Sequence, residues 1–188
     1  MDKRQISKLL KILIKSNSLK EVPRTGWIIK GVKNAESVAD HTWGVSLLGL
    51  LLAPENIDKN KLLKMIIVHD LGEITPGDVR WEEGTKVIGS QSKKRNKELS
   101  VMQELFQAYP EKEIYISLLR EFNEQKTSEA RYLKQIEKLE MVIQAYIYEI
   151  NNKAKKPLDE FWENAKMYLE GKELEPIFRE LQKMRATG

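Results

Sequence analysis

The stretch Ile66-Ile67-Val68-His69-Asp70-Leu71-Gly72-Glu73 decides the fold, because it leads from an apolar helix into a histidine and a carboxylate. Leu62, Ile66 and His69 are separated by four and three residues and therefore share one helical face. That face is apolar, so we expect His69 to point into the protein interior. A buried aspartate is costly unless it is paired or binds a metal ion, so Asp70 marks a candidate chemical site.

The other histidine of the chain occupies a similar setting upstream. It ends the run Glu36-Ser37-Val38-Ala39-Asp40-His41 and lies on one helical face with Val45 and Leu48. The chain contains two histidines in all, each beside a carboxylate and each expected to face inward. Two inward histidines together with Asp70 suit a divalent metal ion. The alternative is that each is a core histidine satisfied by a backbone carbonyl.

Helical periodicity continues through the rest of the chain and predicts an all-α fold, a single helical bundle over residues 1–188. Apolar residues recur at helical spacing in several separate runs, around residues 6–14, 38–52, 62–66, 102–106 and 133–150. Two further helices are expected over 157–186. Proline and glycine interrupt the segments 18–33 and 72–89, and an extended Trp27-Ile28-Ile29 is left open there.

Composition restricts the class of protein. Hydrophobic residues make up 41% of the chain, and no apolar run approaches the ~20 residues of a membrane span. A signal peptide is not apparent, so we expect a cytoplasmic protein without a membrane partner. The chain has no cysteine, which excludes disulfides and thiol nucleophiles. Walker A, Gly-x-Gly-x-x-Gly and Gly-x-Ser-x-Gly motifs are also absent.

The net charge of +4 does not by itself identify a partner. The basic cluster at 92–98 either borders a phosphate site or is a solvated helix start, and we favour the second interpretation. It lacks the interleaved aromatic residues of a single-strand binding platform. No nucleic-acid partner is therefore expected.

The order of these motifs resembles the HD-domain phosphohydrolase superfamily, and specifically the branch that contains 5′-deoxynucleotidases. The likeness is carried by successive blocks that span about residues 5–150: Arg24-Thr25-Gly26-Trp27, Glu36 to His41, His69 to Glu73, Gly77-Asp78 and Lys134 to Glu140. The resemblance implies a bundle of the HD-domain type. It also implies a homodimer, which the residues alone do not indicate.

The same resemblance implies a set of metal ligands: His41, His69, Asp70 and Glu137. Similar proteins normally carry aspartate at the last position, and Glu137 adds one methylene. The alternatives are that Glu137 lies on the helix surface or that nearby Glu140 replaces it. The ligand types do not distinguish cobalt, manganese, magnesium, nickel, iron or zinc.

The resemblance further assigns roles around the metal. Glu73 would activate the attacking water, and Asp78 would assist the leaving oxygen. Arg24 would bind the phosphate and Trp27 would contact the sugar. The alternatives are a solvated helix end for Glu73, a turn residue for Asp78, a surface position for Arg24 and a core-capping Trp27.

The function that follows is a metal-dependent 5′-nucleotidase, which hydrolyses (deoxy)ribonucleoside 5′-monophosphates to nucleoside and phosphate. Its partner would be a small-molecule nucleotide substrate. Three alternatives remain open: a catalytically weak nucleotide-binding protein of the same fold, a phosphohydrolase acting on another nucleotide class, and a basic nucleic-acid-binding helical protein.

Overall fold

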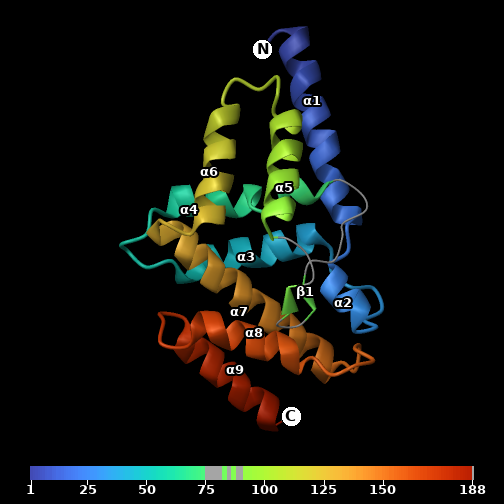
Figure 1. The fold of residues 1–188 in the computed structure, drawn as a ribbon, viewed down its shortest axis with the longest axis vertical. Coiled ribbons are helices and arrows are strands. Elements are labelled where there is room, and N and C mark those ends of the chain that lie inside the picture. The colour runs from blue at the N-terminus through green and yellow to red at the C-terminus, as the bar shows by residue number, and fades with distance from the viewer. Residues whose placement is uncertain (75–81, 84–85, 88–90, 188) are drawn as a thin grey trace.

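A computed structural model describes residues 1–74, 82–83, 86–87 and 91–187, and this part of the chain is almost entirely helical (Figure 1). The α-helices are α1 (Lys3–Asn17), α2 (Thr25–Ile29), α3 (Val38–Leu52), α4 (Lys59–Val68), α5 (Gln91–Leu105), α6 (Lys112–Glu124), α7 (Ser128–Ile150), α8 (Asp159–Leu169) and α9 (Glu175–Thr187). Two 3₁₀ turns, η1 (Ser18–Glu21) and η2 (Leu71–Ile74), join them. Within the described ranges the strands are β1 (Glu82–Glu83) and β2 (Lys86–Val87), one short antiparallel pair. The predicted all-α fold is confirmed.

Helix α7 crosses the middle of the molecule and packs against α3, α4, α6 and α8 (Figure 1). Its core-facing residues Leu133, Ile136, Leu139 and Val142 are fully buried at a spacing of three. The pair α8 and α9 lies against the far side of α7, where Trp162 and Phe178 extend the same hydrophobic core. Among the described helices, none combines the length and apolar character needed to cross a bilayer.

Side-chain caps fix where the site-bearing helices begin. Ser37 and Asp40 form a capping box at the start of α3: Asp40 N–H donates to the Ser37 hydroxyl, and Ser37 N–H donates to Asp40. Asp58 caps α4, and Thr127 caps α7. These caps set the helical phase in which His41 and His69 point inward. They also explain Asp40, whose carboxylate serves the cap.

Two sequence-based expectations need correction. Trp27-Ile28-Ile29 is not extended but forms most of the short helix α2, and the Trp27 ring stacks on Phe161 with centroids 4.2 Å apart. Helix α1 is present as predicted, yet much of its apolar stripe faces solvent, with Ile14 72% exposed and Leu10 50% exposed. In α1 the buried residue is Ile12, and the N-terminal part of this helix extends beyond the bundle (Figure 1).

Close packing of α5 on η2 depends on Gly72. A Cβ atom at this position would lie 2.7 Å from Glu98 Cβ, 2.8 Å from its Cα and 2.9 Å from its carbonyl oxygen. Two of these atoms are backbone and cannot rotate away. The absence of a side chain at Gly72 therefore brings the N-terminal half of α5 next to the turn that carries Glu73.

We predict that Gly72→Ala destabilises the protein by about 1–3 kcal/mol, the usual cost of overpacking a tight helix contact. The free energy of unfolding would be measured by urea denaturation of the metal-free protein. Ser100→Ala, an exposed change on α5, is the control and should stay within about 0.5 kcal/mol. Equal stability of Gly72→Ala and wild type would contradict this account of the α5 contact.

Candidate metal centre and active site

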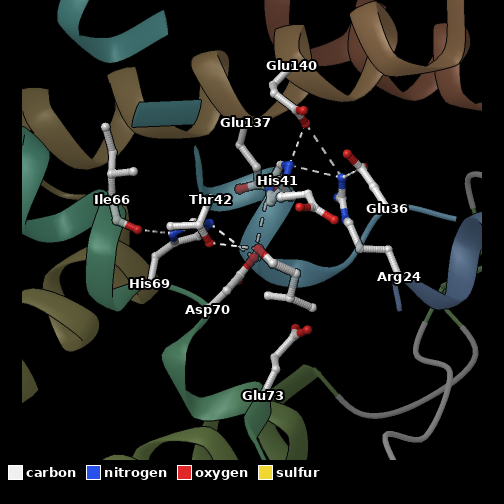
Figure 2. Close-up of polar contacts among 12 residues, drawn as sticks. Arg24, Glu36, His41, Thr42, Ile66, His69, Asp70, Glu73, Glu137 and Glu140 are labelled. Carbon is white, nitrogen blue, oxygen red and sulfur yellow. Dashed lines mark hydrogen bonds and ion pairs between the residues drawn. The ribbon is translucent and has the colours of Figure 1, made fainter. Parts of the chain in front are cut away.

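His41 on α3 and His69 at the end of α4 face each other across the buried centre of the bundle, as the sequence predicts (Figure 2). His41 is 0% exposed and His69 is 2% exposed, and their ring centroids lie 5.9 Å apart. Asp70 follows His69 and places its Oδ2 atom 3.1 Å from His69 Nε2 and 3.9 Å from His41 Nε2. The three side chains therefore converge on one point.

The outer nitrogen of each ring is bound by the protein. His69 Nδ1 lies 2.6 Å from the Ile66 carbonyl, which can only accept, so Nδ1 carries a proton. His41 Nδ1 makes a very short contact with the Glu140 carboxylate. In both rings Nε2 is buried and has no hydrogen-bond partner within the described residues. Two buried nitrogens that make no hydrogen bond and lie near one carboxylate are the pattern that a bound cation would complete.

The electrostatics of this trio fit a cation as well. Burial disfavours a charged imidazole, but the adjacent Asp70 carboxylate outweighs it and raises the pKa of His69 to about 9. Burial likewise opposes ionisation of Asp70, yet His69 and His41 hold the pKa of that carboxyl well below its usual range. Asp70 is thus an anion that attracts positive charge. The ligand atoms of His41, His69 and Asp70 all lie within 4.8 Å of one another, a group that could hold a metal ion.

Glu137, the predicted fourth ligand, is nearby but differently engaged. It does not join the group of ligand atoms found within 4.8 Å among the described residues. Its two oxygens accept from Lys134 Nζ at 3.2 and 3.1 Å, and Lys138 Nζ lies 3.7 Å away. Burial opposes ionisation of Glu137, but these lysines lower its pKa to about 2. Glu137 is therefore an anionic carboxylate paired with lysine.

Glu73 lies on η2 below Asp70, with its side chain directed toward Asp70 (Figure 2). Its carboxylate accepts from Lys94 Nζ at 2.8 Å, and Lys94 also lies 3.4 Å from Glu98. Burial raises the pKa of Glu98 to about 7, although Lys94 opposes the rise. Lys94 belongs to the basic cluster interpreted above as a solvated helix start. The structure instead turns this one lysine inward, a consequence of α5 packing that the cluster's composition does not reveal.

Arg24 and Trp27 meet at Glu36 rather than at an open surface. Glu36 accepts from Arg24 Nη1 at 2.9 Å and from Trp27 Nε1 at 2.8 Å. Trp27 is 1% exposed, so its ring packs in the core. Burial disfavours the guanidinium charge of Arg24, but Glu36 and Glu140 hold its pKa above the usual value. Asp78 lies outside the described residues.

Comparisons with known proteins identify the family of this chain. A family model described as HD domain matches residues 16–180. The chain is 30% identical over 183 residues to the human protein named 5′-deoxynucleotidase HDDC2, covering 96% of this chain and 87% of the human protein. It is 32% identical over 149 residues to the Schizosaccharomyces pombe protein named 5′-deoxynucleotidase hdd1, covering 76% of this chain and 73% of that protein.

A solved structure of a conserved hypothetical protein from Pyrococcus furiosus has the same fold. It superposes with a TM-score of 0.74 at 35% sequence identity and covers 93% of this chain and 99% of that one. The family match includes both histidines, Asp70 and α7, as well as most of the C-terminal pair of helices. The chain therefore belongs to the HD-domain family.

Proposed function

We propose that this chain is a metal-dependent 5′-nucleotidase that hydrolyses deoxyribonucleoside and ribonucleoside 5′-monophosphates to nucleoside and phosphate. The observation that carries the proposal is the pair of buried Nε2 atoms of His41 and His69, which make no hydrogen bond to a described residue and face Asp70, with Glu73 beside them. The names of the curated relatives support the substrate class. The continuous core from α3 to α9 supports a single HD domain over residues 1–188.

Phosphomonoester hydrolysis needs a nucleophilic water, neutralisation of the phosphoryl oxygens and a proton for the leaving alkoxide. His41, His69 and Asp70 would hold a divalent cation, which lowers the pKa of water and neutralises phosphate charge when bound. Glu73 would accept the proton of the attacking water, with its carboxylate fixed by Lys94. Arg24 would meet the phosphate through nitrogens other than Nη1. Asp78 stays the predicted proton donor to the 5′ oxygen.

Phosphate release from a panel of dNMPs and NMPs tests this activity. Metal-stripped protein should be inactive, and reloading with cobalt, manganese, magnesium, nickel, iron or zinc should identify the working ion. Glu73→Gln should lower kcat by about 100-fold or more, because it removes the proton acceptor. Glu104→Gln, at a 72% exposed side chain on α5, is the control that should match wild type.

Absence of release from every monophosphate with every metal, from folded protein, would refute the nucleotidase. Nucleotide binding without turnover would then favour the catalytically weak binding protein, and turnover of another nucleotide would favour a different phosphohydrolase. The hydrogen bonds from Lys134 to Glu137 favour the catalytically weak binding protein as the second candidate, because they occupy the predicted fourth ligand.

Glu137 would become the fourth ligand only when it leaves Lys134, and this dependence can be tested. Glu137→Ala should weaken cobalt binding by about tenfold or more, since an anionic ligand is lost. Lys134→Met should tighten it, because the carboxylate is released from Lys134 and the unbranched methionine can pack near the rings of Phe122 and Tyr168. Isothermal titration of metal-free protein with cobalt measures both. If neither variant changes cobalt affinity, Glu137 is only the partner of Lys134.

We also propose that the protein is a homodimer that associates through α3. Four apolar residues on one face of α3 are exposed: Trp43, Leu47, Leu50 and Leu51. Trp43 is 70% exposed and Leu51 is 68% exposed, more than a monomer usually leaves in contact with water on one helix face. Cytoplasmic localisation stays a prediction.

Light scattering after size exclusion tests the dimer. Wild type should elute at twice the chain mass, and Trp43→Glu should shift it toward the monomer because a charge is placed in the apolar contact. Met167→Glu, an equivalent change at a 60% exposed position on α8, should leave the mass unchanged. A wild-type protein that is monomeric at micromolar concentration would contradict the proposal.

A further inference from the structure

The side of the His41 ring that faces away from Asp70 is surrounded by charged groups. Arg24 Nη1 lies 3.0 Å from His41 Nδ1, and the Glu140 carboxylate is in direct contact with the same nitrogen (Figure 2). Arg24 Nη1 lies 3.6 Å from Glu140 Oε2. The His41 ring is 0% exposed, and the Glu140 side chain is 9% exposed. With so little exposure, the hydrogen-bond partner of Nδ1 is a protein group and not bulk water.

The two neighbours of Nδ1 impose opposite states on the ring. A guanidinium can only donate, so Arg24 would require a lone pair on Nδ1 and a proton on Nε2. A carboxylate oxygen accepts, so a hydrogen bond from His41 to Glu140 places the proton on Nδ1 and leaves the Nε2 lone pair free. Metal ions bind the lone pair of a neutral imidazole. Only the Glu140 contact therefore gives a His41 ring that is ready to bind metal on the side of Asp70.

Contacts other than the one with Glu140 also hold Arg24 in place. Its Nη1 donates to Glu36 at 2.9 Å, and Glu36 also accepts from the buried Trp27 indole. The backbone of Arg24 donates to the Glu36 carbonyl at 3.0 Å, which ties the loop before α2 to the loop before α3. The guanidinium therefore stays beside Nδ1 whatever occupies position 140.

Helix α3 leaves space for the Glu140 carboxylate. Gly44 lies three residues after His41, on the same side of the helix. A Cβ atom there would lie 2.8 Å from Glu140 Oε1 and 3.0 Å from its Cγ. Glycine inside a helix costs about 1 kcal/mol relative to alanine. Close approach of Glu140 to α3 gives this glycine a structural reason.

We propose that Glu140 is a positioning residue that holds His41 in its metal-binding tautomer against the competing donor Arg24. This proposal rests on the proposed function only in taking His41 as a metal ligand. It gives different roles to two glutamates that lie one turn apart on α7. Glu137 is a candidate ligand, and Glu140 acts through the ring of His41.

The test uses zinc alone, titrated into metal-free full-length protein by calorimetry. Glu140→Ala should weaken zinc binding about 10- to 100-fold, the range seen when a histidine loses its outer carboxylate. The double variant Glu140→Ala/Arg24→Met should bind zinc more tightly than Glu140→Ala, because the competing donor is gone. A merely structural role predicts the reverse, since the double variant loses more contacts.

Ring-nitrogen NMR of metal-free, ¹⁵N-histidine-labelled protein provides the second readout. Because the chain contains two histidines, the spectrum holds two ring systems. Glu140→Ala should move the proton of one ring from Nδ1 to Nε2 and leave the other ring unchanged. The control Glu129→Gln removes another buried α7 carboxylate, which contacts Lys61, and should alter neither zinc affinity nor either ring.

Circular dichroism establishes that each variant is folded. If Glu140→Ala does not fold, Gly44→Ala carries the same test, since the added methyl displaces the carboxylate from His41 while favouring the helix. Unchanged zinc affinity in the folded Glu140 or Gly44 variant overturns the inference, as does a double variant weaker than the single one. Suppose that Glu140→Ala loses zinc affinity and that the wild-type protein releases no phosphate from any monophosphate. This result would support the role of Glu140 and refute the nucleotidase activity.

Discussion

The requirement that every nitrogen of two buried imidazole rings find a partner governs this structure. Burying a ring nitrogen without a hydrogen bond or a ligand costs free energy. Protein acceptors satisfy the outer nitrogens, the Ile66 carbonyl for His69 and Glu140 for His41, so both Nε2 atoms are left facing Asp70. α3, α4 and α7 must pack closely enough to supply these contacts, and the helix caps set the phase in which they can. The candidate metal centre thus follows from how the hydrogen bonds of the two buried imidazole rings are satisfied.

Charge pairing explains how so many carboxylates share one small region. Arg24 balances Glu36 and Glu140, Lys94 balances Glu73 and Glu98, and Lys134 with Lys138 balances Glu137. Each cation reaches the site from an element other than α4: the loop before α2, helix α5 or helix α7. Within the described residues, the ion pairs of Asp70 are to the two histidines. No lysine or arginine of the described residues forms an ion pair with Asp70. A divalent cation would therefore stabilise the site most beside Asp70.

Sequence pattern was sufficient for the parts of this site that depend on local periodicity. The spacing of His41 from Val45, and of His69 from Leu62 and Ile66, predicts inward rings, and all of these residues are buried. Long-range packing determines the features of the site that local sequence patterns do not predict. Lys94 turns inward only because Gly72 lets α5 approach η2. The Trp27 ring stacks on Phe161 of α8, a partner that no local sequence pattern indicates. The helical spacing of apolar residues over 6–14 predicts α1 but not that most of these residues face solvent.

Position 137 carries a buried carboxylate that lysine already engages. Glu137 and Glu140 share one face of α7, and both carboxylates lie close to the histidines, so partner availability decides their roles. Lys134 binds both oxygens of Glu137 and competes with any cation for them. Lys134 Nζ also lies 5.6 Å from the Phe122 ring centroid and 5.7 Å from that of Tyr168, so losing the carboxylate would not strand the ammonium. Exchange of Glu137 from lysine to metal is then a modest rearrangement. Glu137 would therefore bind a metal only after leaving Lys134, whereas the candidate ligand atoms of His41, His69 and Asp70 already lie within 4.8 Å of one another.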